Sequence, residues 1–157
     1  MSDSTDRKKR SRKSFSGSYD RAVDLETGRF NLPFRFRRED EDGHPADYVV
    51  TPGLDGNLSI YLADIWDDVF EEAKDDAETV EDTAYIRDIS ANTYDITPDS
   101  QGRVQVPTHM LKSIGVGKKV FVVGMSNHLE LWDKDVYTAH QKANVHPNPG
   151  FKRKRFA

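Results

Sequence analysis

The sequence has no cysteine, and this absence excludes several classes of chemistry across its 157 residues. Disulfide frameworks, thiolate nucleophiles and cysteine-ligated zinc or iron–sulfur sites all require that side chain. No Gly-rich phosphate loop, nucleophile elbow or Ser–His constellation is present either. The five histidines show no zinc-like spacing: His44, His109, His128, His140 and His146. We therefore expect no metal site, no cofactor and no enzymatic activity.

Long apolar runs are also missing. No stretch of about 18 apolar residues occurs, so we expect no membrane-spanning helix. The N-terminus, MSDSTDRKKRSRKS, lacks the apolar stretch of a secretory signal. The sequence nevertheless holds 8 Phe, 6 Tyr and 2 Trp, which argues against wholesale disorder. A chain of this length holds one full domain or two small ones with a shared core. We expect a cytoplasmic protein that does not contact membranes.

Charge is unevenly distributed along the chain, although the formal net charge is only -4. The first 13 residues carry six Lys or Arg and two Asp, a net charge of +4. The run KRKR at 152–155 adds another +4, which leaves residues 14–151 at -12. Segments 1–14 and 147–157 are therefore interpreted as flexible basic tails. They are equally compatible with phosphate-seeking arms and with a solubilising role.

A duplicated motif is the main positive feature. GRFNLP at 28–33 is followed 74 residues later by GRVQVP at 102–107. NLSIY at 57–61 is followed 71 residues later by HLELW at 128–132. This period is too long for a solenoid repeat. It predicts two related halves, 15–90 and 91–146, packed about a pseudo-two-fold axis.

The same order of elements is predicted in each half: strand, turn, strand, short helix, hairpin, helix. Neither small sheet could bury its apolar face alone, so we expect strands of the two halves to pair with each other. In the first half the hairpin is predicted at 48–51 and 58–61. It is followed by an amphipathic helix from about residue 62 and a second helix over 80–90. Tyr85, Ile86 and Ile89 are expected to face inward in that second helix.

In the second half, TYDI (93–96) and RVQV (103–106) flank PDSQG and are predicted to form a tight hairpin. A short helix from Thr108, a strand pair at 119–124 and 128–132, and a last helix over 133–142 follow. The predicted fold is α+β and mainly β, with peripheral helices.

Five ordered blocks of this sequence resemble the MraZ family of bacterial transcriptional regulators. They are FSGSYDRAVD, GRFNLPFRFR, VVTPGLDGNLSIY with Trp66 after it, DSQGRVQVP and VVGMSNHLELWDKDVY. The resemblance covers roughly residues 15–142. It implies two AbrB-like swapped-hairpin half-domains in one chain and subunits that assemble into a closed ring.

The Asp-x-x-x-Arg signature of the family is intact in the second half as Asp99 and Arg103. In the first half, Asp24 and Arg29 have four residues between them. Aligned on Gly28 and Arg29, Leu25 takes the position of the family's Asp and Thr27 that of its usual Lys. The resemblance implies that this turn lies against DNA.

Candidate DNA-binding residues follow from these motifs, because an arginine fork donates two parallel hydrogen bonds to guanine or phosphate. They are Arg29, Thr27, Gly28, Arg103, Arg35 and Arg37, with Asp24, Asp99 and Gly102 shaping the turns. We favour Arg29 for direct contact because its carboxylate partner is displaced. The alternative for Asp99 and Arg103 is a pair that stabilises the hairpin and binds no ligand. The cluster Arg35, Arg37 and Arg38 is predicted to contact phosphate. The alternative is that these arginines pair with the acidic residues 39–42.

The resemblance implies a nucleoid-associated regulator without enzymatic activity. It would bind double-stranded DNA at short direct repeats, in the promoter of its own division and cell-wall gene cluster, as a ring homo-oligomer. The alternative is an oligomeric protein-interaction or antitoxin-like AbrB-fold module with weak or no specific DNA binding. The acidic helix over 64–82 is expected to point away from DNA, or simply to present a solvated face.

Overall fold

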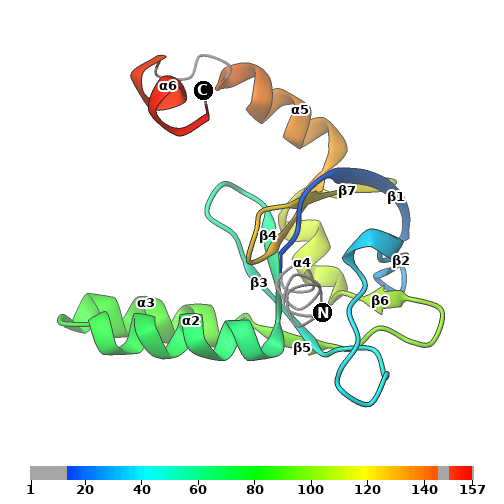
Figure 1. The fold of residues 1–157 in the computed structure, drawn as a ribbon, viewed down its shortest axis with the longest axis horizontal. Helices are drawn as coiled ribbons and strands as arrows, with labels where there is room; N and C mark the ends of the chain where they lie inside the picture. Colours follow the sequence, from blue (N-terminus) through cyan, green and yellow to red (C-terminus); the bar gives the residue numbers. More distant parts are fainter. Residues whose placement is uncertain (1–13, 145–148, 157) are drawn as a thin grey trace, which may run out of the picture.

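The computed structural model describes residues 14–144 and 149–156 (Figure 1). The first half contains strands β1 (Ser18–Asp24) and β2 (Arg29–Asn31) and the one-turn 3-10 helix η1 (Phe34–Phe36). The hairpin β3 (Tyr48–Pro52) and β4 (Leu58–Leu62) follows, and then the helices α2 (Ala63–Asp76) and α3 (Val80–Ala91). Pro33 comes directly before η1, as its fixed φ favours.

The second half repeats this order. It contains β5 (Tyr94–Ile96), β6 (Arg103–Gln105), α4 (Thr108–Ser113), the hairpin β7 (Lys119–Gly124) and β8 (Leu129–Asp133), and α5 (Lys134–Ala143). A further helix, α6 (Pro149–Phe156), lies in the segment interpreted from sequence as a flexible basic tail. The N-terminal tail lies outside the described residues except for Ser14.

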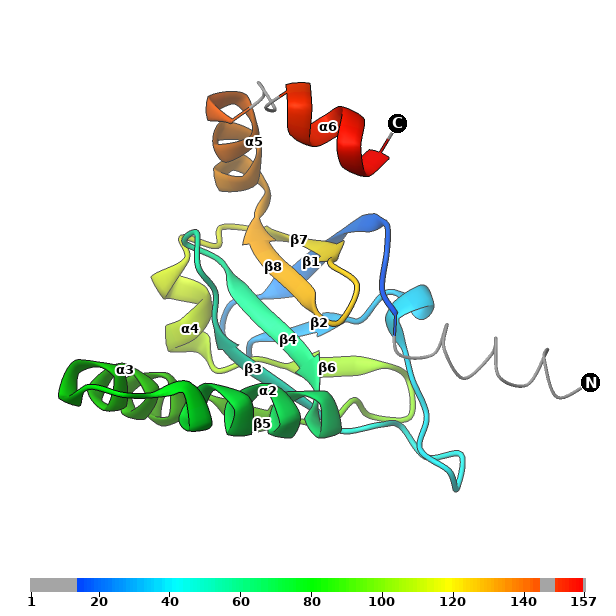
Figure 2. The ribbon, with the colours of Figure 1, turned by 60° about the vertical axis from the view of Figure 1, so that its left-hand side comes forward.

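All strands join one antiparallel 8-stranded sheet with the order β5-β3-β4-β8-β7-β1-β2-β6. The two halves interleave in this sheet, because β1 pairs with β7, β2 with β6, β3 with β5 and β4 with β8. This exchange of strands confirms the predicted pairing between halves and the α+β, mainly β, swapped-hairpin fold. In Figure 2 the sheet separates α2 and α3 at one end from α5 and α6 at the other.

A pseudo-two-fold axis is visible in the register of the sheet. It passes through the pair Phe30 and Val104 at the centre of the β2–β6 ladder. It also passes through Ser59 and Glu130 at the centre of the β4–β8 ladder. The repeated motifs thus lie opposite themselves across the axis, and each supplies half of a shared structure.

The core fills the inside of the curled sheet with residues from both halves. Its fully buried members include Leu32, Phe36, Val50, Leu58, Ile60, Val104, Val106, Leu111, Val120, Leu129 and Leu131. The motif side chains before Pro33 and before Pro107, Leu32 and Val106, are both in this set. The duplicated motif therefore supplies one equivalent core side chain from each half.

The predicted pairing of TYDI with RVQV is wrong, although the tight turn between them exists. β5 pairs with β3 and β6 with β2, and no ladder joins β5 to β6 in the described chain. The turn is closed by the Asp99 N–H, which donates to the Arg103 carbonyl at 2.9 Å. Pro98 precedes it and has no N–H to extend a ladder. The turn therefore connects the two ends of the curled sheet.

The helices α2 and α3 pack less tightly than their sequence pattern predicts. No residue in either helix is buried, and Tyr85, expected to face inward, is 59% exposed. Ile86 and Ile89 are half-buried. The two helices lie against β3 and β4 without closing over them, which leaves an open groove. Among the described helices, none combines the length and apolar composition needed to cross a membrane.

Candidate nucleic-acid interface

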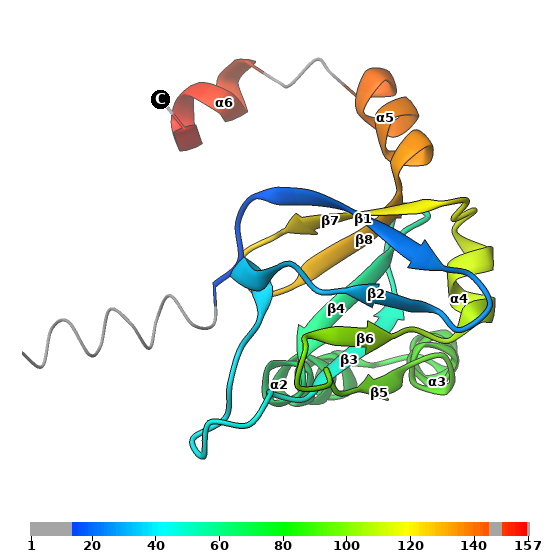
Figure 3. The ribbon, with the colours of Figure 1, turned by 90° about the vertical axis from the view of Figure 1, so that its right-hand side faces the viewer.

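The two Gly-Arg motifs form one two-stranded ribbon, β2–β6. Side chains alternate between faces along a strand, so Phe30 and Val104 point into the core and their neighbours point outward. The outward residues are two arginines and two amides, all exposed: Arg29, Asn31, Arg103 and Gln105. Figure 3 shows β2 and β6 side by side on the face turned to the viewer. The two arginines therefore share one exposed surface.

The pairing within this surface follows the pseudo-two-fold axis. Arg29 lies opposite Gln105, and Arg103 lies opposite Asn31. Each strand contributes one guanidinium and one amide, in diagonal order. The sequence analysis missed Asn31 and Gln105, although their position two residues after each arginine, at strand spacing, was a usable signal. Gln105 also donates from Nε2 to the Thr27 carbonyl at 2.8 Å and so connects the first turn to β6.

The second turn holds its arginine tightly. The Arg103 backbone N–H donates to Asp99 Oδ1 at 2.9 Å, and its Nε donates to Asp99 Oδ2 at 2.7 Å. The Gln101 N–H also donates to Oδ1. These bonds hold the pKa of the Asp99 carboxyl below its usual value, and the bond from the Arg103 backbone N–H has the largest effect. The predicted contact between Asp99 and Arg103 is confirmed.

The first turn contains one more residue but reproduces the same frame. The Gly28 N–H donates to the Asp24 carbonyl at 2.7 Å, as the Gly102 N–H donates to Asp99 at 2.9 Å. Asp24 Oδ1 accepts the Glu26 N–H at 2.9 Å, the counterpart of the Gln101 bond. Asp24, rather than Leu25, thus occupies the position of Asp99. The alignment on Gly28 and Arg29 placed the extra residue before Leu25, whereas the backbone bonds place it between Glu26 and Gly28, at Thr27.

The extra residue changes what holds Arg29. Its backbone N–H donates to Thr27 Oγ1 at 3.3 Å instead of to a carboxylate. No ion pair of Arg29 is present among the described residues, whereas Arg103 is paired with Asp99. The two arginines therefore differ: the Asp99 carboxylate holds the side chain of Arg103, whereas the guanidinium of Arg29 is accessible to a ligand.

The two motif glycines are buried and allow the backbone conformation of the two turns. Gly28 has φ +77° and Gly102 has φ +79°, a region that side chains disfavour. A Cβ on Gly28 would overlap the Val106 carbonyl oxygen, and a Cβ on Gly102 would overlap the Arg37 guanidinium. Because the Gly28 N–H is already donated to Asp24, we assign Gly28 the role of positioning Arg29.

The second basic cluster lies beside the Asp99 turn. Arg37 is half-buried, donates from Nε to the Leu32 carbonyl at 2.9 Å and packs on Gly102, so it supports the turn. Arg35 is exposed. A cleft of about 690 Å³ lies between η1 and this turn, with Arg35, Arg37 and Asp99 in its lining.

Arg38, the third arginine of that cluster, ties η1 to the chain before β1. It donates to the Ser14 carbonyl at 3.0 Å and lies over the Phe15 ring at 4.5 Å. Burial lowers the pKa of its guanidinium from the ordinary value. The alternative that Arg35 and Arg37 pair with the acidic run 39–42 is not observed in the described residues.

One group of potential metal ligands is present in that acidic run. Ligand atoms of Asp40, Asp42 and His44 lie within 4.8 Å of one another. Asp40 Oδ1 accepts the backbone N–H groups of Asp42 and His44, both at 2.9 Å. A local turn around an aspartate accounts for this arrangement.

Comparison with known proteins points to one family. A family model described as "MraZ protein, putative antitoxin-like" matches residues 89–149. A curated relative from Caldanaerobacter subterraneus subsp. tengcongensis, named "Transcriptional regulator MraZ", is 31% identical over 128 residues, which cover 81% of this chain and 86% of the relative.

Two further proteins of the same name are 29% identical. The relative from Clostridium acetobutylicum is matched over 85% of this chain and 92% of its own length. The one from Mycoplasma capricolum subsp. capricolum is matched over 84% and 97%. These relatives are named as regulators, not enzymes. Since the similarity spans nearly the whole of each relative and both copies of the ribbon motif, the chain belongs to the MraZ family.

Proposed function

We propose that this protein is a DNA-binding transcriptional regulator that presents the β2–β6 ribbon to the major groove. The observation that carries the proposal is the shared exposed face of Arg29 and Arg103 with two amides. A major groove admits a two-stranded β-ribbon, arginine suits guanine, and Asn or Gln suits adenine. The diagonal order of the four side chains suits a short site with approximate two-fold symmetry.

The charge distribution supports one orientation on DNA. Residues 63–91 hold eleven Asp or Glu and two Lys or Arg. Figure 1 places the ribbon on the right of the molecule and these helices, α2 and α3, toward the left. A duplex is therefore repelled by the helices and attracted to the ribbon. Thr27, Arg35 and Arg37 flank the ribbon and are proposed as supporting contacts to phosphate.

The proposed mechanism is occupancy. Subunits assemble into a closed ring, adjacent ribbons contact direct repeats in the promoter of the protein's own division and cell-wall gene cluster, and the bound ring blocks or alters access of the polymerase. One ribbon contributes little, and repetition supplies the affinity. The location that fits this role is the cytoplasm, on the nucleoid.

The deciding experiment is a gel-shift titration with DNA from upstream of the gene. Arg29→Ala is expected to lower affinity roughly 5- to 150-fold, since one good arginine–base pair is worth about 1–3 kcal/mol. Arg87→Ala on α3 removes the same charge from the helices opposite and serves as the control. If both variants bind DNA with the affinity of the wild type, the proposal is wrong. Footprinting should show protection at regularly spaced repeats.

An antitoxin-like interaction module is the second candidate, and the open groove beside α2 and α3 favours it. The two candidates differ in salt dependence. A regulator that neutralises phosphates loses affinity steeply as salt rises. If the protein is instead an interaction module, substitution of Arg29 or Arg103 should not change DNA binding at any salt concentration.

A further inference from the structure

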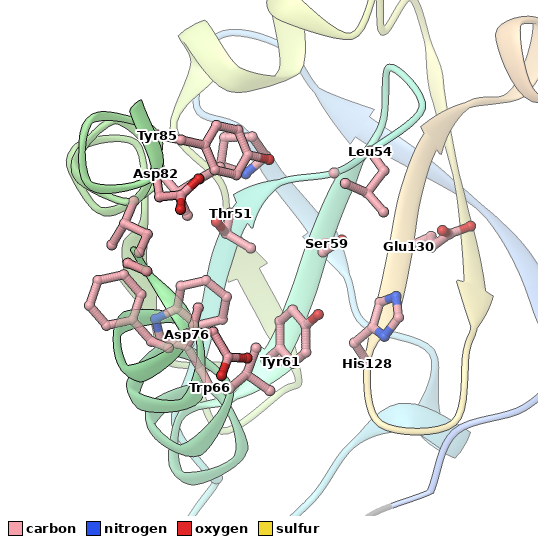
Figure 4. Close-up of a pocket in the computed structure, with 18 of the residues that line it drawn as sticks. Thr51, Leu54, Ser59, Tyr61, Trp66, Asp76, Asp82, Tyr85, His128 and Glu130 are labelled. Carbon is pink, nitrogen blue, oxygen red and sulfur yellow. The ribbon is translucent and has the colours of Figure 1, made fainter. Parts of the chain in front are cut away.

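An open groove lies between the sheet and the acidic helices. It has a volume of about 560 Å³ and is lined by β3, β4, the start of β8, α2 and α3 (Figure 4). Leu54 at its rim is 89% exposed, and Tyr85 on the opposite rim is 59% exposed. Large apolar side chains held open to water in this way mark an interaction surface.

The floor of the groove is aromatic. Tyr61 stacks on His128 with ring centroids 5.0 Å apart and contacts Trp66 at 5.3 Å. Trp66 in turn contacts Phe70 at 5.8 Å. In Figure 4 Tyr61, Trp66 and His128 lie along one side of the opening, below Leu54. Such a floor accepts an aromatic side chain, and its ring faces also attract guanidinium and ammonium groups.

The rim is acidic. Asp55, Asp76, Asp82 and Glu130 line the groove, and α2 and α3 add their strong negative charge around it. A ligand that fits this surface is both aromatic and basic. The helix α6 of this chain has that chemistry: Arg153, Lys154 and Arg155 are exposed on it, and Phe151 is 58% exposed.

We propose that α6 of one copy docks in the α2–α3 groove of a second copy. Phe151 covers the aromatic floor while the basic run meets the acidic rim. This inference rests on the self-assembly in the proposed function and identifies the surfaces that carry it. It assigns the basic C-terminal segment to the protein's own oligomer rather than to DNA.

The fold directs α6 away from the groove of its own chain. His128 and Glu130 lie at the start of β8, whereas α5 leaves from its end at Lys134. A helix of 10 residues carries the chain about 15 Å farther. Figures 1, 2 and 3 all show α5 at the end of the molecule opposite to α2 and α3.

Docking of a tail in a neighbour's groove is a heterologous contact, because the two surfaces differ. Such contacts repeat from copy to copy and produce a ring if the rotation closes. An eight-residue helix buries less surface than a stable dimer needs. Closure of a ring compensates, since each subunit then makes two contacts at high effective concentration.

Charge exchange in the full-length protein tests the proposal in the absence of DNA. The tail variant carries Arg153→Glu, Lys154→Glu and Arg155→Glu, and the groove variant carries Asp55→Lys and Asp76→Lys. Sedimentation velocity gives the assembly constant of each. We expect each variant alone to assemble at least tenfold more weakly than the wild type, and an equimolar mixture to regain assembly.

Matched controls alter the same amount of charge elsewhere. Lys8→Glu, Lys9→Glu and Arg10→Glu reverse three charges in the N-terminal tail, and Asp67→Lys with Asp68→Lys reverses two on α2 outside the groove lining. Both controls should assemble like the wild type. Unchanged assembly of the tail variant overturns the proposal, and so does a wild-type protein that is monomeric.

Disulfide trapping separates docking between copies from docking within one chain. Because the sequence has no cysteine, Leu54→Cys in one protein and Gly150→Cys in another introduce the only thiols. Their mixture should form a cross-linked dimer on oxidation. A chain with both substitutions should form a ladder of multimers. A compact cross-linked monomer from that chain, without a ladder, overturns the proposal.

A DNA measurement keeps this proposal distinct from the proposed function. On a duplex with a single repeat, the tail variant should bind like the wild type, whereas Arg29→Ala should not. Arg29→Ala should assemble normally. If the tail variant loses affinity for the single repeat and keeps its mass, α6 is a DNA arm and the docking proposal fails, whatever Arg29 does.

Discussion

At the residue scale, the two turns show how one extra residue is absorbed. Asp24 and Asp99 each accept, through Oδ1, the backbone N–H of the residue two positions later, and each begins its turn. Only Asp99 also binds the arginine. The sequence could predict the Asp99–Arg103 contact from spacing alone. It could not place Asp24, because the offset between the copies changes inside the turn and only the backbone bonds show where.

The Asp99 carboxyl should titrate below its ordinary pKa. Its folded-state pKa is depressed, so its contribution to stability is present above the unfolded value of about 4 and is lost as the pH falls through the folded pKa. Carboxyl NMR titration measures this directly. Arg103→Ala removes the side-chain bond and should raise the pKa of Asp99 toward its ordinary value. A pKa of Asp99 equal to the unfolded value would contradict the observed geometry.

Gly28→Ala should destabilise the protein through both its backbone and its contacts. A non-glycine residue at φ +77° costs about 1–3 kcal/mol, and the new Cβ also overlaps the Val106 carbonyl. Gly43→Ala is the matched control, since Gly43 has φ +81° but nothing lies within 4 Å of its Cβ position. Urea unfolding should show a larger loss for Gly28→Ala. Equal losses would mean that the close contact with the Val106 carbonyl is unimportant.

At the element scale, the order of strands and helices could be read from the sequence, but not all of their partners. The motif repeat and the requirement for a shared core predicted pairing between halves. The predicted ladder between β5 and β6 is wrong. The two strands follow each other in the sequence, but β5 pairs with β3 and β6 pairs with β2, both in the other half. The positions of α2 and α3 in the chain were predicted correctly. Tyr85, however, lines the open groove, because a 3.6-residue pattern identifies the apolar face of a helix but not the element that covers it.

The short helix α4 should be an anchor for the ribbon. Leu111 is fully buried and packs in the common core to which Phe30 and Val104 of the ribbon also belong. Leu111→Ala should lower the free energy of unfolding by about 2–5 kcal/mol. Lys112→Ala on the same helix is exposed and should change it by less than about 0.5 kcal/mol. Chemical denaturation with an unchanged m-value checks both, and a small effect of Leu111→Ala would place the core elsewhere.

At the scale of the whole molecule, the proposed function makes one ribbon a weak DNA-binding element and assigns most of the affinity to its repetition in an assembly. Duplication creates the two-fold face of the ribbon, and the proposed assembly would present several copies of that face. The arginine-bearing face and the acidic helices lie on different surfaces, so the proposed DNA contact and the proposed subunit contact do not compete for one site. The sequence indicated this separation through its charge distribution, whereas the groove and α6 emerged only with the fold.

Affinity should therefore depend on both the number and the phase of operator repeats. Adjacent ribbons of a ring reach repeats on one side of the duplex, so increasing the repeats from one to three should raise affinity by more than tenfold. Inserting about 5 base pairs between repeats rotates the next one to the opposite side and should remove that gain, and inserting about 10 should largely restore it. The tail variant, which assembles poorly, should show neither effect. Gel shifts on these duplexes at fixed salt measure all four outcomes, and affinity that grows with repeat number regardless of phase would show that the subunits bind independently.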